Sequence, residues 1–161
     1  MLLVENLIMS GGGLVDPYFE NVALLLHGDG TNGGQNNTFI DGSTNNFTIT
    51  RNGNTTQGSF NPYGTLWSNY FDGNGDVLTA SSNAAFQFGT GDFTVEFWVY
   101  LFTVGSVSEE TFICTRGIGT GFQCTRRTSN WTVDLNSTAP SIATASNVLV
   151  NGAWTHKAVI S

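Results

Sequence analysis

The stretch DFTVEFWVYLF, at Asp92–Phe102, is the clearest β-strand in this sequence. Its side chains alternate in character with the two-residue period of a strand. We therefore predict one long strand here, with two chemically distinct faces. One face comprises Phe93, Val95, Phe97, Val99 and Leu101, and the other comprises Thr94, Glu96, Trp98, Tyr100 and Phe102.

Shorter stretches on either side also predict strands. Val22–His27 is apolar at nearly every position, which suits a strand buried on both faces. Ser68–Thr79 predicts a hairpin that turns at Asp72–Asp76, because Asp, Asn and Gly are typical turn residues. No helical period follows residue 13, so we predict an all-β protein with many turns. The remaining expected strands are Trp131–Leu135, Ile142–Ala145 and Trp154–Ile160.

Composition and charge limit the classes of partner. The 12 acidic residues outnumber the 5 basic ones, which gives a formal net charge of -7. A domain this acidic has no general attraction for nucleic acid or for anionic membrane surfaces. No apolar stretch approaches the roughly 20 residues that a membrane-spanning helix needs. We therefore expect no nucleic-acid partner and no membrane insertion.

The length of 161 residues fits one domain, preceded by a short leader. Residues 1–13 hold an apolar segment, then Ser10 and three glycines, and such a glycine run is a flexible joint. We read these residues as a leader or docking arm, and 14–161 as the domain. The start has no Lys or Arg before its apolar part, and Glu5 interrupts that part, so it predicts no secretory signal.

The two cysteines, Cys114 and Cys124, lie in TFICTRGIGTGFQCTR, which predicts a hairpin around its glycine-rich centre. A turn centred on Gly119 would place the two residues opposite each other, and a disulfide would then be geometrically allowed. The alternative is two reduced, buried thiols, which synthesis in the cytoplasm favours.

Four motifs then point to a family. Along the chain they read VALLLHGDGTNG (22–33), NYFDGNGDVLT (69–79), FQFGTGDFTVEFWVYL (86–101) and NGAWTHKAVIS (151–161). In this order they resemble the laminin-G-like, concanavalin A-like lectin/glucanase superfamily, and most of all its copies in phage tail-fibre and other virion surface proteins. The resemblance implies a jelly-roll sandwich of two antiparallel sheets. In the family further strands follow the last motif, so we expect the C-terminal strands of the sandwich to be missing after Ser161.

Calcium binding is one candidate chemistry. Asp72, Asn74 and Asp76 have the spacing that opens a calcium loop, and Asp29 is a second weak candidate. The Gly and Glu that an EF-hand needs further along are absent, so a tight turn is the favoured interpretation. Related lectins do use loop carboxylates, which keeps weak calcium binding as the alternative.

Hydrolysis is a second candidate. The resemblance implies that a glucanase of this superfamily would carry three acidic residues at alternate positions of one strand. Here Asp92 and Glu96 flank Thr94, so that motif is incomplete. Neither histidine, His27 or His156, accompanies a recognisable nucleophile, and we expect both to have packing roles.

Ligand binding through aromatic and basic side chains is the third candidate. Tyr63, Trp67 and Tyr70 lie among polar residues, as a sugar-stacking surface requires, although a core position is the better interpretation for Trp67. Arg116 and Arg126 would share one hairpin face with phenylalanines and form a cationic patch for an anionic sugar or partner. The alternative is that these arginines balance nearby acids.

These features predict a non-enzymatic surface module of a virion, such as a tail-fibre, head-fibre or capsid-decoration protein. Its expected roles are structural assembly and attachment to host-surface glycans. Other copies of the chain or other virion proteins are the expected partners, and the expected location is the virion surface after synthesis in the host cytoplasm. We expect no cofactor, with calcium as the one alternative. The alternative functions are a soluble carbohydrate-binding lectin or adhesin, and a degenerate glycoside hydrolase.

Overall fold

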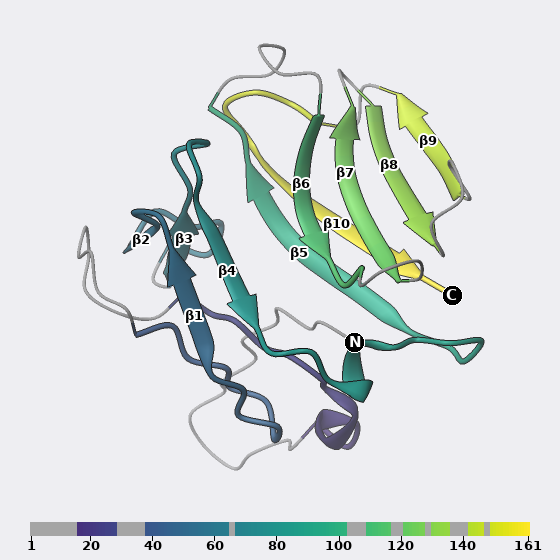
Figure 1. Cartoon of the computed structure of the whole chain (residues 1–161). Helices are drawn as coiled ribbons and strands as arrows, with labels where there is room; N and C mark the ends of the chain where they lie inside the picture. The colour runs from purple at the N-terminus through teal and green to yellow at the C-terminus, as the bar shows by residue number, and fades with distance from the viewer. Residues whose placement is uncertain are drawn as a thin grey trace. The chain divides into compact units, whose positions relative to one another are not determined.

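The computed structural model describes residues 16–28, 38–64, 67–102, 109–116, 121–127, 130–135, 142–146 and 149–161. The predicted leader at 1–13 lies outside these residues. The described elements are strands and two single 3-10 turns, η1 (Phe19–Asn21) and η2 (Ala84–Phe86), so the all-β prediction is confirmed (Figure 1). No helix in the described ranges is long and apolar enough to cross a membrane. The strands are β1 (Ile49–Asn52), β2 (Thr56–Gly58), β3 (Ser68–Tyr70), β4 (Val77–Ala80), β5 (Thr94–Tyr100), β6 (Glu109–Cys114), β7 (Phe122–Arg127), β8 (Asn130–Leu135), β9 (Ile142–Ser146) and β10 (Trp154–Ile160).

The chain divides into two compact units. The first unit takes Met1–Ser82, Phe93–Phe97 and Ala158–Ile160, and the second takes Asn83–Asp92, Trp98–Lys157 and Ser161. Strands β5 and β10 pair with each other and contribute residues to both units. The prediction of one domain over 14–161 stays a prediction.

The first unit contains two antiparallel pairs, β1 with β4 and β2 with β3. The hairpin predicted over Ser68–Thr79 is therefore wrong, because β3 and β4 flank the turn but pair with different strands. The Asp76 carboxylate explains the geometry. It accepts the amide of Asp72 (2.8 Å) across the turn and the amide of Asn54 (2.7 Å) in the β1–β2 connection. The turn is thereby fixed to β1 and β2 rather than closing a hairpin of its own.

The strand predicted at Val22–His27 is also wrong, since only isolated bridges form there, such as Leu26 with Asp41. Val22 and Leu25 are nevertheless buried, as the apolar run predicts. The amide of Leu25 donates to the carboxylate of Asp41 at 2.9 Å. A side chain thus takes the place of a neighbouring strand, and no regular ladder develops.

Strand β5 confirms the long strand predicted at Asp92–Phe102, although its regular part is shorter by a few residues at both ends. Strand β10 has the bounds that the sequence predicts. Val95 of β5 and Val159 of β10 are buried, in agreement with the alternation of apolar positions.

The second unit is built on a four-stranded sheet in the order β6-β7-β8-β9, in which neighbouring strands are antiparallel (Figure 1). One of its faces is apolar and buried. Phe122, Cys124 and Trp131 on this face are exposed by 1%, 0% and 7%. The ammonium of Lys157 lies 5.6 Å from the centre of the Trp131 ring, and burial lowers the pKa of this lysine.

The hairpin of β6 and β7 corrects the prediction for the cysteines. Cys114 lies opposite Gln123, and Cys124 lies opposite Ile113, with an irregularity between Thr111 and Ile113. The register is thus one residue away from the one that a turn centred on Gly119 would give. Because successive side chains of a strand point to opposite faces, the two sulfur atoms lie on opposite sides of the sheet. Both thiols are free, Cys114 is exposed and Cys124 is buried, so the structure contains no disulfide between them.

Candidate functional site

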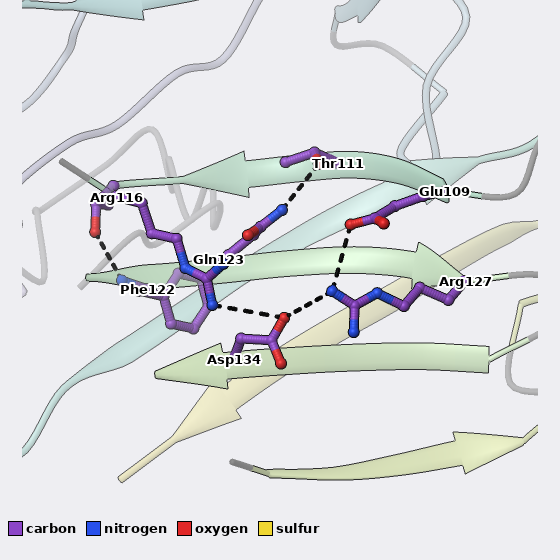
Figure 2. Close-up of polar contacts among 8 residues, drawn as sticks. Glu109, Thr111, Arg116, Phe122, Gln123, Arg127 and Asp134 are labelled. Atoms are coloured by element: carbon purple, nitrogen blue, oxygen red, sulfur yellow. Dashed lines mark hydrogen bonds and ion pairs between the residues drawn. The ribbon is translucent and has the colours of Figure 1, made fainter. Parts of the chain in front are cut away.

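The opposite face of the four-stranded sheet is polar, and we call it the polar face. The registers of β6, β7 and β8 place its members on one side: Glu109 opposite Arg127, Thr111 opposite Thr125, Thr125 opposite Thr132, and Gln123 opposite Asp134. Alternation along each strand creates this face, because the residues between these positions form the apolar core. Figure 2 shows the longer side chains of the polar face reaching toward one another over β7. We define the polar face as Glu109, Thr111, Arg116, Gln123, Thr125, Arg127, Thr132 and Asp134.

The end of the β6–β7 hairpin fixes Arg116 beside this sheet. The amide of Thr115 donates to the carbonyl of Phe122 (2.8 Å), and the amide of Phe122 donates to the Thr115 hydroxyl (3.1 Å). Gly121 has a φ of +139°, and a Cβ at that position would lie 2.8 Å from the Cα of Arg116. Only glycine lets the two backbone segments approach so closely in this conformation.

Asp134 is the centre of the polar face. Its side chain is 2% exposed, and its Oδ2 lies 3.2 Å from Nη2 of Arg127 and 3.7 Å from Nη2 of Arg116 (Figure 2). The same Nη2 of Arg127 lies 3.5 Å from Oε1 of Glu109. Two arginines and two carboxylates therefore form one network, whose formal charges sum to zero.

The deep part of the polar face holds buried polar atoms whose hydrogen-bonding capacity is unused. In the part of the chain that the structure describes, Nε of Arg116, the hydroxyls of Thr125 and Thr132, and Oδ1 of Asp134 have no hydrogen-bond partner. Thr125, Thr132 and Asp134 are exposed by 0%, 1% and 1%. Burying such a group without a partner costs about 1–3 kcal/mol. Four such atoms lie on this one face, and each is enclosed by the protein.

The upper part of the polar face is accessible. The side chains of Glu109, Arg127 and Arg116 are exposed by 44%, 39% and 25%. Gln123 donates to the Thr111 hydroxyl at 3.2 Å and closes the β6 side (Figure 2). This rim therefore presents hydrogen-bond donors and acceptors together, while Thr125, Thr132 and Asp134 below it are buried.

The structure does not bring Arg116 and Arg126 to one face, so that part of the predicted cationic patch is wrong. Arg126 lies on the apolar face, 1% exposed, where its Nε is 2.8 Å from Oε2 of Glu110 and its Nη2 is 2.7 Å from Oε1. Arg116 pairs with Asp134 instead. The alternative that each arginine balances an acid is confirmed for both.

The predicted aromatic candidates belong to the first unit. Tyr63 and Tyr70 are exposed by 44% and 46%, as a sugar-stacking role requires. Trp67 is half-buried, next to the start of β3. The ligand-binding role of these aromatic residues stays a prediction.

The calcium candidates form a turn. The Asp76 carboxylate binds the two backbone amides described above, and Oδ1 of Asp72 accepts the amide of Asn74 at 2.7 Å. Burial by itself raises the pKa of Asp76, but the hydrogen bonds that the Asp76 carboxylate accepts lower the pKa by a larger amount. The pKa of Asp76 therefore lies below the usual value. Asp29 lies outside the described residues. Within the described ranges no group of three or more His, Cys, Asp and Glu is placed to hold a metal ion.

The residues of the predicted hydrolase strand lie apart from the polar face in sequence, on and before β5. Asp92 is exposed and precedes the strand, while Glu96 is half-buried within it. Further along, the ring of His156 lies 5.1 Å from that of Trp98, and Tyr100 lies 5.6 Å from Trp154. The packing role expected for His156 agrees with this ring contact, although its side chain is exposed.

Sequence reasoning missed the polar face. A signal for it was present: Gln123, Thr125 and Arg127 alternate with Phe122 and Cys124. The same period continues in the next strand, where Thr132 and Asp134 alternate with Trp131 and Val133. What the sequence lacks is the register, which decides that these polar positions lie side by side.

Comparison with known proteins gives the family. A laminin G domain model, described as concanavalin A-like lectin/glucanases superfamily, matches residues 71–161, which is more than half of the chain. No curated protein and no solved structure matches the chain. The matched region includes the turn at Asp72–Asp76, the long strand β5, the whole four-stranded sheet and β10. On this match the chain belongs to the concanavalin A-like lectin/glucanases superfamily.

Proposed function

We propose that this chain is a non-enzymatic carbohydrate-binding module whose binding surface is the polar face. The observation that carries the proposal is the accessible rim of that face, where the carboxylate of Glu109 and the guanidinium groups of Arg127 and Arg116 lie together. Membership of a superfamily consistent with carbohydrate-binding or adhesion-type modules supports it. Sugars suit such a rim, because each hydroxyl can both donate and accept a hydrogen bond.

The charges of the polar face favour binding over catalysis. Hydrolysis of a glycosidic bond uses two carboxylates that flank the bond. On the polar face, Asp134 and Glu109 both bind the same guanidinium nitrogen of Arg127. They are therefore engaged with a cation that lies between them, where the bond to be cleaved would have to lie.

We also propose that the module is displayed on a virion surface, next to other copies of itself or other virion proteins. The support is the order of the four sequence motifs, which resembles that of phage tail-fibre proteins. Proteomic analysis of purified particles tests this placement, and recovery only from uninfected cells would contradict it. Light scattering of the purified chain tests self-association.

The binding function is tested with the full chain on a glycan array. We expect it to bind at least one glycan, and we expect Glu109→Gln to weaken that binding by about tenfold, the loss of one charge-assisted hydrogen bond. Glu20→Gln is the matched control, since it makes the same change at an exposed residue outside the polar face. Binding that Glu109→Gln leaves unchanged in a folded protein, or no binding to any glycan, would contradict the proposal.

A further inference from the structure

A row of aromatic rings lies along one side of the paired strands β5 and β10, within the second unit (Figure 1). The centres of the Trp98 and His156 rings lie 5.1 Å apart. The centre of the Tyr100 ring lies 5.6 Å from that of Trp154 and 5.1 Å from that of Phe102, which follows the end of β5. These contacts advance by two residues along each strand, which is the spacing of side chains on one face of a strand pair. We call these five residues the aromatic face.

The aromatic face points away from the apolar core of the second unit. On β10 the ammonium of Lys157 lies over the Trp131 ring of the four-stranded sheet. Because successive side chains of a strand point to opposite sides, Trp154 and His156 point away from that sheet. His156 is exposed, Phe102 is 64% exposed, and the other three rings are half-buried. The row of rings is therefore in contact with solvent.

The segment before β10 holds one end of the aromatic face in place. Leu101 forms a bridge with Asn151, and the amide of Gly152 donates to the carbonyl of Leu101 at 2.9 Å. A Cβ at Gly152 would lie 3.7 Å from the hydroxyl oxygen of Tyr100, so the tyrosine lies close to this backbone. Side chains that are fixed before binding lose less conformational entropy when a ligand binds.

The chemistry of the aromatic face favours a neutral sugar as its ligand. The faces of aromatic rings are electron-rich and attract the polarised C–H groups of a sugar ring. The only Lys or Arg in the two strands is Lys157, which lies on the opposite side. A nucleic acid, an acidic polysaccharide or a second copy of this chain, with its net charge of -7, would therefore meet no lysine or arginine on these strands.

We infer that the aromatic face is a second glycan-binding surface, which stacks on a neutral oligosaccharide. The inference rests on the carbohydrate-binding function proposed above, but it uses strands other than those of the polar face. Trp98, Tyr100 and Phe102 lie at every second position, over a length of about 13 Å at the rise of a strand. The row is thus longer than one sugar ring and suits a chain of several. The exposed imidazole of His156 can form a hydrogen bond with a sugar hydroxyl.

Substitutions of Phe102 test the inference, because its exposed ring contributes little to the core and the free energy of unfolding should be almost unchanged. The experiment is affinity electrophoresis of the full chain in neutral β-glucan, mannan and galactan, with EDTA present. We expect Phe102→Leu, which removes the ring but keeps an apolar side chain, to weaken binding by about three- to tenfold, and Phe102→Trp to retain binding. Phe60→Leu is the matched control, since Phe60 is 52% exposed in the first unit.

The outcomes separate this inference from the proposed function. Binding that Phe102→Leu leaves unchanged, or weakens no more than Phe60→Leu does, would overturn the inference, and so would loss of binding in Phe102→Trp. If Glu109→Gln still weakens glycan binding, the proposed function stands. A lower mass of Phe102→Leu in light scattering, with unchanged glycan binding, would make the aromatic face an interface between copies and would also overturn the inference. Absence of binding to the neutral polysaccharides and to every glycan on the array would refute both.

Discussion

The pair of Arg126 and Glu110 gives the sharpest stability prediction. The guanidinium of Arg126 is 1% exposed, and both oxygens of Glu110 contact it, at 2.7 and 2.8 Å. Glu110→Gln removes the charge and leaves one acceptor, so a buried cation loses its counter-ion. Such a loss costs about 3–5 kcal/mol when both partners are buried. Because the Glu110 side chain is 36% exposed, solvent reduces the effect, and we expect about 2–3 kcal/mol.

Urea denaturation measures this change in the free energy of unfolding. A thermal melt should show a decrease in Tm on the order of 5–10 °C. Glu109→Gln is the matched control at the preceding residue, where the side chains of Glu109 and Arg127 are exposed by 44% and 39% and lie 3.5 Å apart. That exposed pair should contribute less than about 1 kcal/mol. Equal effects of the two substitutions would refute the reasoning that burial of the arginine sets the cost.

Three further predictions concern other parts of the chain. Burial by itself raises the pKa of Asp41, but the hydrogen bonds that its carboxylate accepts lower the pKa by a larger amount. The folded pKa therefore lies below the usual 3.8. The stability that ionised Asp41 contributes is therefore fully present above pH 3.8 and is lost as the pH falls through the folded pKa. Urea titrations from pH 6 to pH 2 should show that the free energy of unfolding falls less steeply with acid in Asp41→Asn than in the exposed control Asp16→Asn. Gly121→Ala should lower the free energy of unfolding by roughly 1–3 kcal/mol in urea denaturation, because the new Cβ would lie 2.8 and 2.9 Å from backbone atoms. An unchanged free energy of unfolding would contradict the close approach of the two backbone segments. A reducing agent should leave the Tm of the freshly purified chain unchanged, because the Cys114 and Cys124 side chains point to opposite faces; a fall in Tm would indicate a disulfide.

Alternation within single strands is what the sequence predicts well. The strand β5, the bounds of β10 and the all-β class follow from the period of apolar residues, which is a local property. The two-residue period also contained the polar positions of β7 and β8. Local pattern therefore predicted several of the strands, although it wrongly predicted a strand at Val22–His27 and the polar face was not recognised from it.

Pairing between strands is what the sequence does not supply. The turn at Asp72–Asp76 was correct as a turn, but its carboxylate binds the amide of Asn54, far away in the chain, and the hairpin does not form. The interruption near Phe112 shifts the register by one residue and separates the two cysteines. Both outcomes depend on contacts between distant residues, and no local period records them.

Arg126 illustrates the same limit at the level of the site. From the sequence alone, a single arginine in an apolar strand is expected to be exposed, because its buried partner cannot be identified. Glu110 lies 16 residues earlier, on the neighbouring strand, and only the register of β6 and β7 brings the two together. The expected cationic patch failed for this reason.

The alternation of β7 and β8 has a consequence for how this protein can diversify. Because the polar face and the apolar core occupy alternating positions, substitutions at 123 and 127, whose side chains are not buried, alter no core side chain. A library restricted to these codons would sample new specificities on a preserved scaffold. A one-codon insertion inside β7 would instead exchange the two faces beyond it, so lineages of this sheet should vary by substitution and keep their strand lengths.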